Sequence, residues 1–123
     1  MDLLYKIVRR LLRDDDVDFS RNRNYEAYDD PMVRRAVRIY RHLRSVEKDL
    51  LAAEDGDVEL TALERSGSRI VVRLALESGD GRRESFLEQR EWDMLLESDR
   101  VSGILHRLLD DAPRETQKIL VEE

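Results

Sequence analysis

The spacing of apolar residues changes near residue 57, from a helical period to strict alternation. Before this point apolar residues recur every three or four positions, as on the buried stripe of an amphipathic helix. After it, residues 69–77 alternate between polar and apolar side chains, as in a strand with one buried face. A chain that has both periods packs helices against a sheet, so the sequence predicts an α+β fold.

Two helices are predicted before the change of period. Asp2 is a suitable N-cap for the first of them, in which Lys and Arg lie opposite an apolar stripe. The second should begin at Asp30 and Pro31, an N-cap followed by the residue preferred at the first helical position. It should end at Gly56. Residues 14–30 are rich in Asp, Asn and Ser, and they predict a long polar connection between the two helices.

The alternating segment predicts a three-stranded antiparallel meander over about residues 57–88. Turns that contain glycine, at residues 66–68 and 78–81, separate its strands. The face that we expect to be buried consists of alternate apolar residues of the first two strands: Val58, Leu60, Ala62, Ile70, Val72, Leu74 and Leu76. Amphipathic helices are the elements that could cover this face.

The helical period returns after Gln89, with Trp92 as the expected anchor of the core beneath the sheet. A further helix should begin at Ser98 or Asp99, and residues 113–123 fit either a helix or an edge strand. The predicted order of elements is therefore α-α-β-β-β-α-α.

The length of 123 residues favours a single domain, residues 1–123. We expect residues 1–56 to form its helical half and residues 57–123 its meander with the C-terminal helices. Charged residues make up 41% of the chain, so the surface must be densely charged. Residues 1–48 carry 12 basic and 9 acidic side chains, whereas residues 49–123 carry 10 and 19. This asymmetry suits contact between the halves, self-association or an anionic partner.

The sequence offers little for catalysis. It lacks cysteine and a Gly-x-Ser-x-Gly motif, and its two histidines, His42 and His106, fall on predicted helices. The glycine turns join strand to strand, whereas a phosphate-binding loop leads into a helix. We therefore predict that the chain is not an enzyme, and we assign no catalytic residue and no cofactor. The alternative is an enzyme whose site forms between subunits.

A metal site is also not predicted. Asp14, Asp16 and Asp18 alternate like the start of a calcium-binding loop. Such a loop requires Gly at its sixth position and Glu at its twelfth, and here these positions hold Phe19 and Tyr25.

We expect a cytoplasmic protein that does not span a membrane. No apolar run reaches the length of about 18 residues that a transmembrane helix needs. The N-terminus lacks the features of a secretory signal, and cysteine is absent. The basic amphipathic residues 2–13 could lie on a membrane surface, but packing on the protein's own core is the favoured interpretation.

The first candidate binding site is the basic face of the second predicted helix. Its residues are Arg34, Arg38, Arg41 and Lys48, with Arg35 and Arg44 at the margins. Guanidinium groups bind carboxylates and phosphates through paired hydrogen bonds. The plain alternative is a solvated face that the acidic second half of the chain balances. A sequence pI of about 5.1 argues for a protein partner over a nucleic acid.

The second candidate binding site lies in residues 19–28, where Arg, Asn and Tyr alternate. Its members are Phe19, Arg21, Arg23, Tyr25 and Tyr28. Such side chains are enriched at binding hot spots, although the aromatic ones could simply anchor the segment to the core. Together the two sites predict a non-catalytic protein-interaction module: an adaptor, a regulatory protein or a structural subunit of a larger assembly. A homo-oligomer and a nucleic-acid-binding protein are the alternatives.

Overall fold

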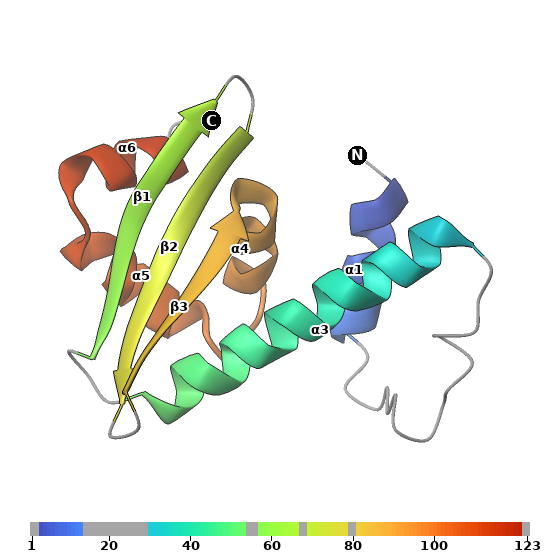
Figure 1. The fold of residues 1–123 in the computed structure, drawn as a ribbon, viewed down its shortest axis with the longest axis horizontal. Helices are drawn as coiled ribbons and strands as arrows, with labels where there is room; N and C mark the ends of the chain where they lie inside the picture. The colour runs from blue at the N-terminus through green and yellow to red at the C-terminus, as the bar shows by residue number, and fades with distance from the viewer. Residues whose placement is uncertain (1–2, 14–29, 54–56, 67–68, 79–80, 122–123) are drawn as a thin grey trace. The chain divides into compact units, whose positions relative to one another are not determined.

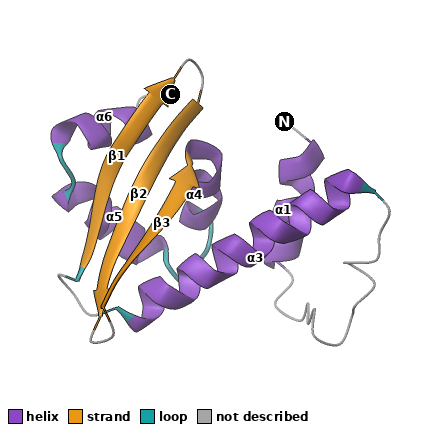
Figure 2. Ribbon diagram, in the orientation of Figure 1, coloured by secondary structure: helices purple, strands orange, loops and turns teal. Residues whose placement is uncertain are grey.

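The computed structural model describes residues 3–13, 30–53, 57–66, 69–78 and 81–121 (Figure 1). In these ranges the chain forms five helices and a three-stranded sheet, in the order α-α-β-β-β-α-α-α. The α+β fold is confirmed, and the C-terminal tail is a helix rather than a strand (Figure 2). Backbone contacts divide the chain into two compact units, Met1–Ser45 and Val46–Glu123. The single domain stays a prediction.

The first unit contains α1 (Leu3–Arg13) and most of α3 (Pro31–Ala52). The backbone N–H of Met32 donates to Oδ1 of Asp30 over 2.9 Å, so Asp30 is the N-cap that the sequence predicted. Pro31 takes the first helical position, where no N–H is needed. Three other predicted features, the cap Asp2, the connection 14–29 and the end at Gly56, lie outside the described residues.

The core of the first unit joins its two helices. Leu11 of α1 is buried in one cluster with Val37 and Tyr40 of α3. The partly buried side chains packed against this cluster are Ile7, Leu12 and Val33. Because these residues recur every three or four positions, each helix contributes one apolar stripe to the contact. Most of the apolar stripe that the sequence predicted on each helix is buried, whereas two of its members, Leu3 and Met32, are exposed.

The second unit contains an antiparallel sheet whose strands follow the sequence order: β1 (Val58–Ser66), β2 (Arg69–Ser78) and β3 (Gly81–Glu88). Leu60 of β1 and Ser85 of β3 lie opposite Leu74 of β2, so their side chains share one face, the inner face. The predicted inward residues on this face are buried or partly buried: Val58, Leu60, Ala62, Ile70, Val72, Leu74 and Leu76. The predicted meander and its buried face are confirmed.

Three helices of the second unit lie on the same side of the sheet: α4 (Gln89–Leu96), α5 (Ser102–Asp111) and α6 (Arg114–Val121) (Figure 1). Trp92 of α4 is fully buried and is confirmed as an anchor of the core. At the start of α4 the N–H of Glu88 donates to Oε1 of Glu91 over 2.9 Å, as in a capping box. On α6, Oγ1 of Thr116 accepts the N–H of Ala62 over 3.0 Å and so covers this point on the edge of β1.

The helix α5 begins later than the sequence predicted. Ser98 and Asp99 lie in a turn, which the hydrogen bond from the N–H of Ser102 to the carbonyl oxygen of Ser98 closes over 2.9 Å. A serine before an apolar run usually accepts an N–H of the next helix, and this preference led to the wrong start. The hydroxyl of Ser98 instead donates to Oε2 of Glu47 over 2.6 Å.

The contact between Ser98 and Glu47 ties the last turns of α3 to the α4–α5 turn within the second unit. Glu47 is buried, with 2% of its surface exposed. We expect Ser98→Ala to lower the free energy of unfolding by about 1–2 kcal/mol, because a buried carboxyl group loses a donor. Urea unfolding, followed through the fluorescence of Trp92, measures this change.

Ser45→Ala is the matched control for Ser98→Ala, since Ser45 is exposed on the same helix as Glu47. It should change stability by no more than about 0.5 kcal/mol. Equal unfolding midpoints for the two variants would show that the hydroxyl of Ser98 does not support Glu47.

Candidate functional site

The predicted basic face of α3 is exposed in the structure. Arg34, Arg35, Arg38 and Arg41 all have exposed side chains. With a rise of 1.5 Å per residue, the row from Arg34 to Arg41 spans about 10 Å of the helix surface. Within the described ranges, Arg34, Arg35 and Arg38 make no ion pair. Three exposed guanidinium groups thus lie on one stretch of helix without a carboxylate partner among the described residues.

The composition of this stretch is unusual for a solvated helix surface. No acidic residue occurs between Asp30 and Glu47, although 28 of the 123 residues are Asp or Glu. Arg34 and Arg38 are neighbours one turn apart, and two like charges in this relation destabilise a helix by about 0.2–0.5 kcal/mol. The helix thus concentrates positive charge against its own local preference.

Arg44, which was predicted at the margin of the basic face, has a different environment. Its Nη2 donates to the carbonyl oxygen of Leu12 over 2.7 Å, and its Nε donates to the hydroxyl of Tyr40 over 3.3 Å. The guanidinium carbon also lies 5.3 Å from the centroid of the Tyr40 ring, within cation–π range. The structure therefore places Arg44 in a contact between α1 and α3, apart from the exposed row.

The second predicted site has no structural counterpart to describe. Phe19, Arg21, Arg23, Tyr25 and Tyr28 all lie outside the described residues. Their role in binding stays a prediction.

The sheet presents a second surface that the sequence did not indicate. Its outer face, the side turned away from α4, α5 and α6, carries Phe86, of which 49% is exposed. Val71 lies near it on β2, and Leu63 is exposed where β1 has an irregularity in its pairing. Alternation in the strands could have indicated this surface, because residues that alternate with the buried ones must face outward. Among the outward-facing residues, nothing in the sequence distinguished Phe86 as exposed.

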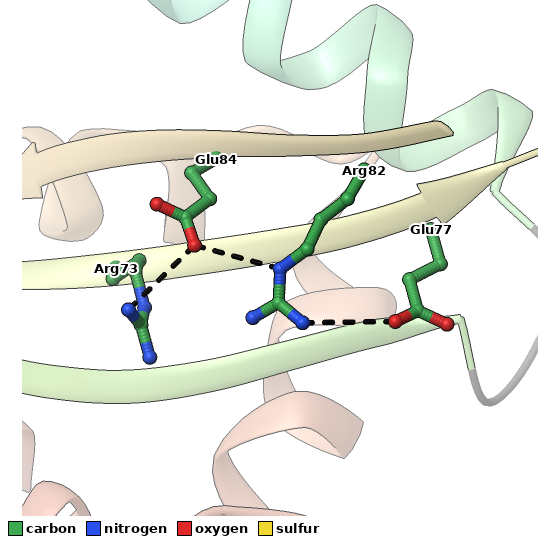
Figure 3. A network of polar contacts seen from close by, with 4 residues as sticks. All are labelled: Arg73, Glu77, Arg82 and Glu84. Atoms are coloured by element: carbon green, nitrogen blue, oxygen red, sulfur yellow. Dashed lines mark ion pairs between the residues drawn. The ribbon is translucent and has the colours of Figure 1, made fainter. Parts of the chain in front are cut away.

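The outer face also carries charged side chains, and four of them form a network of ion pairs (Figure 3). Oε1 of Glu84 lies 3.6 Å from Nη1 of Arg73 and 3.5 Å from Nε of Arg82. A second oxygen, Oε1 of Glu77, lies 3.6 Å from Nη1 of Arg82. At the other end of the sheet, Nη2 of Arg69 lies 3.2 Å from Oε1 of Glu88. The positive charges of this face are thus balanced by neighbouring carboxylates.

Among the described residues no group of three or more His, Asp or Glu side chains could hold a metal ion. Of the helices in the same ranges, none has both the length and the apolar character needed to cross a bilayer.

No protein-family model, no curated protein and no solved structure matches this chain.

Proposed function

We propose that the chain is a non-catalytic protein-interaction module that binds an acidic segment of a partner protein through the exposed arginines of α3. One comparison within the molecule supports this proposal. Arg69, Arg73, Arg82 and Arg83 of the sheet each lie 3.2–3.6 Å from a carboxylate oxygen. Arg34, Arg35 and Arg38 have no such partner among the described residues. A partner that brings carboxylates to α3 would supply the missing negative charge.

The small energy of a single ion pair means that binding at α3 requires several contacts together. One exposed ion pair contributes about 0–1 kcal/mol, which is too little for specific binding. A row of guanidinium groups on a rigid helix keeps its geometry, so less order is lost when a partner binds. The same row raises the association rate through long-range attraction, and this contribution falls as salt rises. Adaptors and assembly subunits use binding of this kind.

The test replaces Arg34, Arg38 and Arg41 with Glu in one variant. We expect at least a tenfold loss of affinity for a fluorescent polyglutamate peptide, because attraction becomes repulsion. The helix should remain folded, since Glu and Arg have similar helix propensities. Fluorescence anisotropy measures binding, and circular dichroism checks the fold. In capture experiments from a native lysate, the polyglutamate peptide should displace certain proteins from the wild type. The α3 variant should fail to capture those same proteins.

The matched control carries Lys6→Glu, Arg114→Glu and Lys118→Glu, which give the same change of net charge at exposed positions elsewhere. It should bind the peptide within about twofold of the wild type at about 150 mM salt, where distant charges are screened. Unchanged binding by the α3 variant, or equal loss in both variants, would refute the role of the α3 face.

A nucleic acid could bind the same arginines, and the same variants test this alternative. Labelled single- and double-stranded oligonucleotides of random sequence serve as probes. Phosphate contacts give a steep fall of affinity with salt. If the oligonucleotides bind tightly at about 50 mM salt and the peptide does not, the chain is a nucleic-acid-binding protein rather than a protein-interaction module.

A further inference from the structure

The described part of the first unit has a large excess of positive charge. Residues 3–13 contain four Lys or Arg and no acid, and residues 30–45 contain five Arg and one acid, Asp30. Oδ1 of Asp30 accepts the N–H of Met32 at the start of α3. These two stretches therefore provide nine cations and a single carboxylate, which already serves as an N-cap.

Two contacts place the end of α1 beside α3 (Figure 1). The side chain of Leu11 is buried against α3, and the carbonyl oxygen of Leu12 accepts a hydrogen bond from Nη2 of Arg44 over 2.7 Å. The last turn of α1 thus lies next to the turn of α3 that ends at Arg44. Arg41 belongs to that same turn of α3, and its side chain is exposed.

The last turn of α1 carries Arg10 and Arg13, and both side chains are exposed. Neither makes an ion pair within the ranges that the structure describes. Cations in the last turn of a helix interact favourably with its dipole, which accounts for a small part of the stability of α1. The contact with α3 gives these two cations a second property, because it holds them beside the exposed arginine row of α3.

From this arrangement we infer that Arg10 and Arg13 extend the binding site, so that the acidic segment of the partner lies across both helices. The inference rests on the proposed function, because it enlarges the same site. The row on α3 covers about 10 Å, and packed helices are about 8–10 Å apart. The bound segment therefore spans about 20 Å, which requires about six extended residues. The partner that fits is a protein with a run of about six or more residues rich in Asp and Glu.

A lipid surface fits these cations less well than a protein segment does. A basic amphipathic helix binds a bilayer by inserting its apolar stripe. In α1 this stripe is not available, because Leu4, Val8 and Leu11 are buried, with at most 6% of each exposed. An acidic segment needs only the charged side chains, and these are exposed.

The test compares two fluorescent polyglutamate peptides, of about four and about ten residues, binding to the full chain. The short peptide covers only the row on α3, whereas the long peptide covers both helices. A variant with Arg10→Gln and Arg13→Gln should bind the long peptide about fivefold less tightly, because two ion pairs are lost. It should bind the short peptide within about twofold of the wild type. Fluorescence anisotropy at about 150 mM salt measures both affinities.

The matched control carries Arg114→Gln and Lys118→Gln, two exposed changes on α6 that alter the net charge equally. It should bind both peptides as the wild type does. Gln has a helix propensity close to those of Arg and Lys, so circular dichroism should show no loss of helix in either variant. Equal weakening of the short and the long peptide by the α1 variant would overturn the inference, because loss of structure in the first unit has that effect.

The inference and the proposed function can fail separately. If the Glu variant of α3 loses affinity but the α1 variant binds the long peptide as its control does, the inference is wrong and the proposed function stands. If the α3 variant keeps its affinity, the proposed function is wrong and the inference falls with it. Binding of vesicles that contain phosphatidylserine, unaffected by an excess of the long peptide, would overturn the inference and assign α1 to a lipid surface.

Discussion

Trp92→Ala is expected to lower the free energy of unfolding by about 3–5 kcal/mol, because it removes the largest fully buried side chain of the second unit. Trp92 lies on α4, which contacts both β2 and β3. Truncation to Ala leaves a cavity at the inner face of the sheet, and the surrounding side chains can close it only in part. A loss of this size is a large share of the stability of a domain, about 5–15 kcal/mol. Urea unfolding followed by circular dichroism measures it, since the variant has no tryptophan.

Two further variants keep this prediction testable if Trp92→Ala does not fold. The indole Nε1 of Trp92 is buried, and the described residues offer it no hydrogen-bond partner. Trp92→Phe therefore removes an unpaired donor together with some volume, and it should cost no more than about 2 kcal/mol. Phe86→Ala should change stability by less than about 1 kcal/mol, because Phe86 is half exposed. A folded Trp92→Ala variant that loses no more stability than Phe86→Ala would contradict Trp92 as the anchor.

The elements that could be predicted are those in which local and long-range preferences agree. Asp30 and Pro31 define the start of α3 by local chemistry, and the apolar stripe that follows them is long. In β2, alternation alone gave the correct buried face, since a strand has only two faces. The buried position of Trp92 followed from its place in a helical apolar stripe next to the sheet. Such signals depend on near neighbours and are visible in one sequence.

The features that could not be predicted depend on distant partners. Ser98 resembles an N-cap in its local sequence, but its hydroxyl binds Glu47, which is 51 positions away. The exposure of Phe86 depends on which side of the sheet α4, α5 and α6 cover, and because Phe86 and its neighbour Leu87 are both apolar, alternation in β3 did not decide which of them is buried. Thr116, which accepts the N–H of Ala62, is likewise 54 positions from its partner. Contacts between residues this far apart in the sequence are set by the packing of the elements, so local sequence patterns do not reveal them.

In the candidate site, too, local features could be predicted and distant contacts could not. Helical period correctly placed Arg34, Arg35, Arg38 and Arg41 on an exposed face. The same helical period predicted Arg44 at the margin of that face. Whether a residue at the margin faces solvent depends on whether another helix lies next to it. In the structure the end of α1 provides a carbonyl oxygen, 32 positions away, and Arg44 binds it. The spacing of arginines alone could not separate a docking residue from one that holds two helices together.

Arg44→Ala is therefore expected to destabilise the first unit by about 2–4 kcal/mol. The variant loses a charge-assisted hydrogen bond to the carbonyl of Leu12, worth about 1.5–3 kcal/mol. It also loses a cation–π contact with Tyr40, worth about 0.5–1 kcal/mol. A carbonyl in the last turn of a helix also attracts positive charge, so the guanidinium acts as a cap for α1. Hydrogen exchange of the α1 amides should accelerate by at least tenfold, because opening of this helix becomes easier.

Arg38→Ala is the matched control, since it removes the same side chain from an exposed position of the same helix. It should leave the exchange of α1 unchanged and alter stability by less than about 0.5 kcal/mol. Arg44→Lys should lie between the two, because an ammonium group can reach one acceptor but lacks the planar fork that serves both Leu12 and Tyr40. The prediction would be wrong if Arg44→Ala left the hydrogen exchange of α1 unchanged and weakened binding of the acidic peptide. Arg44 would then belong to the binding surface.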